Sequence, residues 1–138
     1  MRTPSITDRP AAADAAVADE APKMTILVVD DDALIASSTV GMLEDLGHDV
    51  LEANTPARAL EILRNGRTID LLITDYLMPK MNGAQLAIAA REVRPGLPVL
   101  LATGFADIAP ESRLDLPRLG KPYRQSQLVA AIAKAMAA

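Results

Sequence analysis

The stretch IDLLITDYLMPKMNG, residues 69–83, joins a short apolar segment to a turn that begins at an acidic residue. The apolar segment, Leu71 to Ile73 with Ile69 before it, has the length of a buried strand rather than of a helix. Asp75 stands where this segment ends, and the proline, asparagine and glycine that follow predict a turn. A buried strand that ends in an acid facing a loop is typical of a site at the carboxyl edge of an open parallel sheet. Because aspartate is also a common turn residue, Asp75 on its own is equally compatible with a purely structural role.

The composition predicts one domain with an aliphatic core. The chain has 138 residues, half of them apolar, but only Phe105, Tyr76 and Tyr123 are aromatic. A net charge of -4 without a cluster of lysine and arginine argues against a nucleic-acid surface. The sequence has no cysteine, which excludes disulfides and thiolate metal sites, and no apolar run as long as a membrane span. These features are compatible with a cytoplasmic protein that binds neither nucleic acid nor membrane.

The first 23 residues differ in composition from the rest of the chain. They are rich in alanine, proline and aspartate, and Ile6 and Val17 are their only larger aliphatic side chains. Such a segment buries too little apolar surface to fold, and it lacks the basic start and apolar centre of a signal peptide. We therefore predict a disordered tail at residues 1–23 and one folded domain at residues 24–138.

Strand-like and helix-like patterns alternate through residues 24–138. Strands are predicted at residues 24–29, 49–53, 69–74, 98–102 and 116–119, and helices at residues 34–46, from Pro56 to Leu63, 83–94 and 125–137, with a short or irregular helix at 107–114. Pro117 restricts the last strand to a sheet edge. Five strand-then-helix units indicate an α/β fold, a doubly wound parallel sheet with helices on both faces, because parallel neighbours need helical crossovers.

Polar residues follow four of the five predicted strands. They are Asp30 and Asp31 after the first strand, Asp75 after the third, Thr103 after the fourth and Lys121 after the fifth. Because the carboxyl ends of parallel strands meet at one edge of a sheet, we expect these side chains to converge on one crevice.

Three carboxylates and an ammonium predict a particular chemistry. Crowded carboxylates raise one another's pKa or bind a cation, and all-oxygen ligands suit Mg²⁺. A metal site alone needs neither Lys121 nor Thr103, whereas a phosphoryl group is contacted well by an ammonium and a hydroxyl. One acid then acts as the nucleophile and forms an aspartyl phosphate, and Asp75 is the better candidate because it stands alone on a central strand.

Four motifs together resemble the receiver domain of two-component response regulators. They are VVDDD at residues 28–32, DLLITDYLMPKMNG at 70–83, ATG at 102–104 and KPY at 121–123, in receiver-like order and spacing. The resemblance covers residues 24–138. It implies a flavodoxin-like fold of five parallel strands in the order 2-1-3-4-5 with five helices.

The resemblance also implies a role for each site residue. Asp75 matches the phosphoacceptor and, with Asp30, Asp31 and the carbonyl group of Leu77, a ligand of Mg²⁺. Thr103 matches the switch hydroxyl, and Lys121 matches the lysine that contacts the phosphoryl group and precedes a cis peptide bond. The donor is then a phosphohistidine of a sensor histidine kinase or of a histidine phosphotransfer protein. Such a domain catalyses its own phosphorylation and dephosphorylation, is not a turnover enzyme, and acts by protein contact.

Two positions depart from the receiver pattern. Arg118 stands where receivers commonly carry an aromatic switch residue, so the usual coupling of Thr103 to that residue is in question. Phe105 is a candidate substitute, against the simpler interpretation of loop packing. Leu77 and Phe105 occupy the two positions that tune dephosphorylation in the family, and both are apolar. We hypothesise that they shield an acyl phosphate on Asp75 from water and slow its hydrolysis.

Other functions are weighed against this one. The principal alternative is a pseudo-receiver, a binding scaffold that is never phosphorylated. A flavin-binding protein of the same topology is disfavoured because three aspartates after the first strand would repel a flavin phosphate. An aspartyl-phosphate phosphatase would need a substrate pocket or cap insertion that the length does not allow. We expect either a stand-alone receiver without an output domain or the receiver portion of a hybrid kinase, with a monomer favoured.

Overall fold

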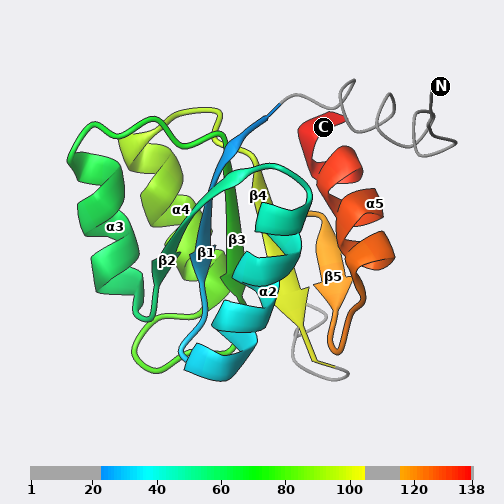
Figure 1. The fold of residues 1–138 in the computed structure, drawn as a ribbon. Helices are drawn as coiled ribbons and strands as arrows, with labels where there is room; N and C mark the ends of the chain where they lie inside the picture. Colours follow the sequence, from blue (N-terminus) through cyan, green and yellow to red (C-terminus); the bar gives the residue numbers. More distant parts are fainter. Residues whose placement is uncertain (1–22, 105–115, 138) are drawn as a thin grey trace, which may run out of the picture.

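The computed structural model describes residues 23–104 and 116–137 (Figure 1). Its elements are β1 (Thr25–Val29), α2 (Ala33–Asp45), β2 (Asp49–Ala53), α3 (Pro56–Arg64), β3 (Leu71–Asp75), α4 (Gly83–Val93), β4 (Val99–Thr103), β5 (Arg118–Gly120) and α5 (Gln125–Ala137). All neighbouring strands are parallel, in the order β2-β1-β3-β4-β5. The predicted α/β fold and strand order are confirmed. The predicted tail, apart from Lys23, and the predicted helix at 107–114 lie outside the described residues.

Helices cover both faces of the sheet, α3 and α4 on one face and α2 and α5 on the other (Figure 1). Successive residues of a strand therefore alternate between two apolar layers. Leu72 of β3 packs with Leu63 of α3 and Leu86 of α4, whereas Ile73 packs with Leu43 of α2 and Leu128 of α5. Burial on both faces explains why β1, β3 and β4 read as continuous apolar runs rather than as alternating patterns. Each fully buried aliphatic side chain contributes about 1.5–3 kcal/mol to folding.

The last strand begins two residues later than predicted. β5 spans Arg118–Gly120 rather than residues 116–119. Pro117 stays outside the strand because it has no N–H to donate to a neighbour. Its carbonyl oxygen nevertheless accepts the Leu101 N–H at 3.0 Å, so the chain is already beside β4 there.

Side chains mark the start of three helices. Asp32 caps α2 by accepting the N–H groups of Leu34 and Ile35. Thr55 caps α3, and Asn82 forms a capping box with Gln85 at the start of α4. These caps fix where each helix leaves the carboxyl edge of the sheet. No helix within residues 23–104 or 116–137 has both the length and the apolar character needed to cross a membrane.

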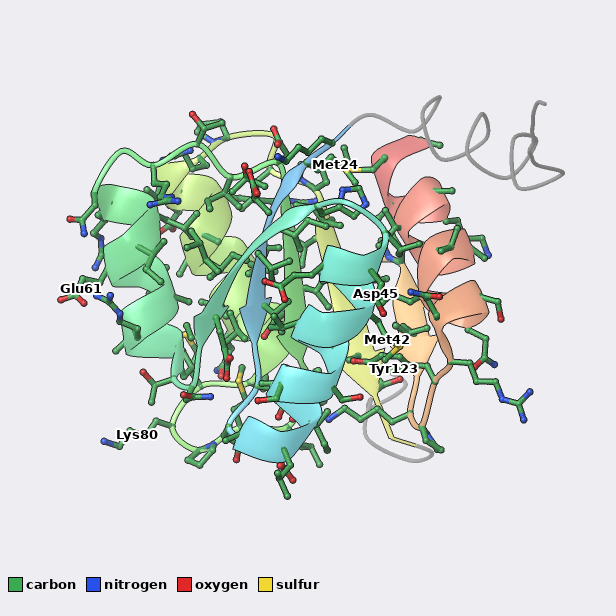
Figure 2. All side chains as sticks on the ribbon, in the orientation of Figure 1. Met24, Met42, Asp45, Glu61, Lys80 and Tyr123 are labelled. Carbon is green, nitrogen blue, oxygen red and sulfur yellow. The ribbon has the colours of Figure 1, made fainter. Side chains whose placement is uncertain are left out.

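His48 fastens the beginning of β1 at the opposite edge of the sheet. Its Nδ1 atom accepts the N–H of Met24 at 3.1 Å, and Met24 in turn accepts the Asp49 N–H at 2.9 Å. Figure 2 shows Met24 at this end of the sheet. A nitrogen that accepts an N–H cannot carry a proton, so the fold requires neutral His48. Burial correspondingly lowers the pKa of His48.

We expect this contact to make stability depend on pH. Because the pKa of His48 is lower in the folded state than the ordinary 6.5, its contribution is complete above pH 6.5 and is lost as the pH falls through the folded-state pKa. The loss is at most the ~1 kcal/mol of one hydrogen bond. Urea unfolding at pH 7.5 and pH 5.5 measures it. His48→Gln, whose amide oxygen accepts an N–H without titrating, should show a smaller difference between the two pH values; an equal difference would contradict the assignment.

Candidate functional site

Four strands deliver polar side chains to the carboxyl edge of the sheet, the lower edge in Figure 1. Asp30 follows β1, Asp75 ends β3, Thr103 ends β4 and Lys121 follows β5. The parallel register places Asp75 opposite Ala102 and Thr103 opposite Gly120, so these strands end at similar heights. The convergence that the sequence predicts is therefore present in the structure.

Three carboxylates form the acidic centre of this edge. One oxygen from each of Asp30, Asp31 and Asp75 lies within 4.8 Å of the others. Asp30 and Asp75 are 4% and 7% exposed, whereas Asp31 is exposed to solvent. Carboxylate oxygens without histidine or cysteine are the donor set of a hard divalent cation, so the residues present fit Mg²⁺.

Lys121 places a positive charge between two of these carboxylates. Its Nζ lies 2.8 Å from Asp75 Oδ1 and 3.4 Å from Asp30 Oδ2. Burial lowers the pKa of the Lys121 ammonium, but the hydrogen bond to Asp75 and the charges of Asp30 and Asp75 outweigh it, and the net pKa is raised. Lys121 is therefore charged at neutral pH and neutralises part of the acidic centre.

The Asp75 carboxylate is held in a less favourable environment than an exposed aspartate. Burial raises the pKa of Asp75; the hydrogen bond from Lys121 works against this shift, and the negative charges of Asp30 and Asp31 add to it. Lys121 contacts Asp75 through Oδ1 and, within residues 23–104 and 116–137, the second oxygen of Asp75 is not part of an ion pair with a lysine or arginine. A poorly solvated carboxylate with one oxygen available suits a nucleophile.

Backbone and amide groups orient Asp30. Its Oδ1 accepts the Asp32 N–H at 2.8 Å. Its own N–H donates to Ala53, and its carbonyl oxygen accepts Asn54 Nδ2 at 3.2 Å. Both carboxylate oxygens of Asp30 are thus engaged, one by Asp32 and one by Lys121, whereas Asp31 is open to solvent. Nothing in the local sequence pattern signals the contact between Asn54 and Asp30.

The turn after Asp75 is held against β4 and α4. Tyr76 donates its N–H to Ala102 at 2.9 Å, and its carbonyl oxygen accepts the Gly83 N–H at 2.7 Å. A Cβ atom added to Gly83 would lie 2.4 Å from the Asp75 carbonyl oxygen, so only glycine allows this approach. Within the turn, Lys80 has a positive φ of 73° and projects away from the sheet (Figure 2). The side chain of Leu77 is 55% exposed.

Thr103 and Arg118 lie on β4 and β5, and Lys121 follows β5 directly. Thr103 is 8% exposed, and its carbonyl oxygen accepts the Lys121 N–H at 2.7 Å. The Lys121–Pro122 peptide bond is cis, as the resemblance implies. Arg118 is an exposed residue at the start of β5, and Phe105 lies outside the described residues. The switch and tuning roles of Thr103, Arg118, Phe105 and Leu77 stay predictions.

Comparisons with known proteins agree with this geometry. Residues 26–133 match the family described as response regulator receiver domain. The response regulator receiver protein CpdR of Brucella abortus is 37% identical over 117 residues, which cover 82% of this chain and 97% of CpdR. The sensor kinase CckA of the same organism is 29% identical, over 78% of this chain but 12% of the kinase. The relatives therefore include both arrangements expected from the sequence, a receiver protein and part of a kinase.

Solved structures give the same result. The crystal structure of a response regulator receiver protein from Sinorhizobium medicae has a TM-score of 0.71 and 31% identity, covering 84% of this chain and 96% of that one. The receiver domain of the hybrid histidine kinase CckA has a TM-score of 0.68 and 29% identity, covering 81% of this chain and 98% of that one. By its fold, its sequence and the residues at its carboxyl edge, the chain belongs to the response regulator receiver domain family.

Proposed function

We propose that the chain accepts a phosphoryl group on Asp75 in a Mg²⁺-dependent reaction and signals through the phosphorylated form. The observation that carries this proposal is the placement of the Lys121 ammonium 2.8 Å from Asp75 inside a cluster of three carboxylates. A structural ion pair needs one acid and one base, whereas this site gathers the groups that a phosphoryl transfer requires.

The proposed step transfers phosphorus from nitrogen to oxygen. A carboxylate oxygen of Asp75 attacks the phosphorus of a phosphohistidine, the O–P bond forms, the N–P bond breaks, and its electron pair remains on the imidazole nitrogen, which then takes up a proton. Lys121 and the Thr103 hydroxyl contact the phosphoryl oxygens. Asp30, Asp31, Asp75 and the Leu77 carbonyl group would hold Mg²⁺, and the cation would supply charge neutralisation when bound.

Acetyl phosphate tests the proposal without a protein donor. With Mg²⁺ we expect wild-type protein to gain one phosphoryl group, an increase of about 80 Da in intact mass for an aspartyl phosphate. EDTA in excess over Mg²⁺ should prevent the gain. Wild-type protein that stays unlabelled, with its fold intact and Mg²⁺ present, would overturn the proposal in favour of the pseudo-receiver, the non-phosphorylated binding scaffold.

An apolar groove beside Lys121 suits the phosphohistidine-bearing domain of the donor. The groove has a volume of about 480 Å³, and its lining runs from Leu34, Ile35 and Met42 on α2 to Lys121 and Pro122. Because Lys121 contacts Asp75, a domain seated in this groove would stand next to the phosphoacceptor. Leu34 is 83% exposed and offers an apolar contact at the groove rim.

Leu34→Glu is expected to slow phosphorylation by a protein donor without changing the rate of phosphorylation by a small-molecule donor. A charge at this apolar rim should slow phosphorylation by a phosphorylated histidine kinase or phosphotransfer protein about tenfold or more, as hot-spot contacts do. Acetyl phosphate needs no docking, so its rate should stay at the wild-type value. Time courses of intact mass with each donor measure both rates. Equal slowing with the two donors would place Leu34 in the chemistry instead of the interface.

Leu77 is expected to lengthen the life of the aspartyl phosphate. Its apolar side chain, two residues after Asp75, cannot orient an attacking water molecule, whereas an amide can. In Leu77→Asn, the aspartyl phosphate should therefore be hydrolysed about two- to tenfold faster than in wild type. The decay of the added mass after removal of acetyl phosphate gives the rate. Leu34→Asn, an identical change on α2, serves as the control, and identical decay in the Leu77 variant and wild type would remove the shielding hypothesis for this residue.

A further inference from the structure

Two side-chain hydrogen bonds tie the segment that follows Lys121 to helix α2. The hydroxyl groups of Tyr123 and Thr39 are hydrogen-bonded to each other. Gln125 Nε2 donates to the Met42 carbonyl oxygen at 3.0 Å. Figure 2 shows Tyr123 beside α2, close to Met42. The loop that carries Lys121 is thus fastened to α2 at two points.

The hydroxyl pair joins a buried threonine to a partly buried tyrosine. Thr39 is 1% exposed, and a buried hydroxyl without a partner is costly. Burial is the main cause that raises the pKa of Tyr123, so its phenol stays neutral, and either hydroxyl of the pair can donate to the other. The pair therefore forms a fixed polar contact within a largely apolar face.

Apolar packing does not close the space between α2 and this loop. The groove of about 480 Å³ described above lies between Leu34, Ile35 and Met42 on one side and Pro122 and Tyr123 on the other. Where side chains leave such a gap, the distance between two elements depends on the contacts that bridge it. The Thr39–Tyr123 bond and the Gln125 amide provide that bridge.

The bridge completes a closed ring of contacts that begins and ends at Asp30. One oxygen of Asp30 accepts the Asp32 N–H, and the Asp32 side chain caps the start of α2. Helix α2 carries Thr39, Thr39 bonds Tyr123, and Tyr123 follows Lys121 by two residues. Lys121 Nζ returns to the other oxygen of Asp30 at 3.4 Å. The position of Lys121 relative to Asp30 is therefore fixed by contacts that run through α2 as well as by the path of β5.

We propose that the hydroxyl pair of Thr39 and Tyr123 is a positioning device for Lys121. It holds the loop at the distance from α2 at which the Lys121 ammonium reaches Asp75 and Asp30 together. The inference rests on the proposed function where Lys121 contacts a phosphoryl group, but the placement of Lys121 is measurable without any phosphoryl transfer.

Competitive acetylation of lysines in EDTA measures how firmly Lys121 is held. Limited reaction with acetic anhydride followed by peptide mass analysis gives the labelling of Lys121 relative to exposed Lys134 in the same molecule. Tyr123→Phe and Thr39→Val each remove one hydroxyl with little change of shape. Both should raise the Lys121/Lys134 ratio about three- to tenfold, the range that one lost hydrogen bond allows.

Two control variants separate positioning from general loosening. Thr39→Ser keeps the hydroxyl and should keep the wild-type ratio. Ile132→Val loosens the apolar cluster of α5 against which Tyr123 packs but keeps both hydroxyl groups, and its ratio should also be unchanged. A wild-type ratio in Tyr123→Phe, or an equal rise in Ile132→Val, would overturn the proposal.

Phosphorylation by acetyl phosphate then tests the consequence. Tyr123→Phe should be phosphorylated about three- to tenfold more slowly than wild type, and Ile132→Val at the wild-type rate. If Tyr123→Phe raised the Lys121/Lys134 ratio but left the phosphorylation rate unchanged, the positioning role would be overturned. If wild type takes up no phosphoryl group, the proposed function fails, while the Lys121/Lys134 ratio still decides whether the hydroxyl pair places Lys121.

Discussion

The Asp75→Asn variant is expected to take up no phosphoryl group under conditions that label wild-type protein completely. The amide has nearly the shape of the carboxylate but lacks a nucleophilic oxygen, so labelling should fall below detection. Intact mass after incubation with acetyl phosphate and Mg²⁺ measures it. Asp45→Asn removes the same charge from the exposed end of α2 and should be labelled like wild type.

The stability of the same variant checks that lost labelling is not lost folding. Because burial and two neighbouring acids raise the pKa of Asp75, its charged form is disfavoured in the folded protein. A neutral side chain there should leave the free energy of unfolding unchanged or higher at pH 7, and Lys121 keeps Asp30 as a partner. Urea unfolding tests this. A folded Asp75→Asn protein that still gains a phosphoryl group would place the acceptor on another residue.

Gly83→Ala is expected to damage both the fold and the site. The added Cβ would lie 2.4 Å from the Asp75 carbonyl oxygen and 3.0 Å from both Leu101 Cδ2 and Tyr76 Cα. Two of these three atoms belong to the backbone of the turn that presents Asp75, so the turn must move. Overpacking of this kind costs about 1–3 kcal/mol, and a displaced catalytic group reduces rates by about tenfold to a hundredfold.

Gly41→Ala is the matched control for this substitution. Gly41 lies in α2, and nothing lies within 4 Å of a Cβ atom added there. The change should stabilise the helix by up to ~1 kcal/mol and leave phosphorylation unaltered. Urea unfolding and acetyl phosphate labelling of both variants measure the contrast. If Gly83→Ala had the same stability and phosphorylation rate as Gly41→Ala, the close contact between Gly83 and the Asp75 carbonyl oxygen would matter neither for folding nor for phosphorylation.

The fold was largely predictable because strands that are buried on both faces of the sheet appear in the sequence as continuous apolar runs. The strands β1, β3 and β4 are short apolar runs that end in polar residues, and the bounds of β2 and α5 coincide with those predicted. The start of β5 was predicted two residues too early, since the apolar pattern around Pro117 does not show which residue can donate to β4.

The strand topology predicted which residues meet at the site, but not their contacts and distances. Parallel strands bring Asp30, Asp75 and Lys121 to one edge whatever their exact distances. That Lys121 lies closer to Asp75 than to Asp30 depends on the path of its loop, which no local pattern encodes. Tyr123 reads in the sequence as part of a KPY motif, and its bond to Thr39 requires knowing how α2 lies against that loop. The need for glycine at position 83 likewise arises from a contact with the backbone of β3 rather than from its own turn.

The distance along the chain between the paired site residues has a consequence for synthesis. Asp30 and Lys121 are 91 positions apart, and every strand pair of the sheet is parallel and therefore non-local. At roughly 5–20 residues per second, a ribosome needs roughly 5–18 s to add the residues between them. During that time a nascent chain carries the acids without the ammonium that neutralises them. Under the proposed function, the complete site thus forms only after Lys121 has been added, late in the synthesis of the domain.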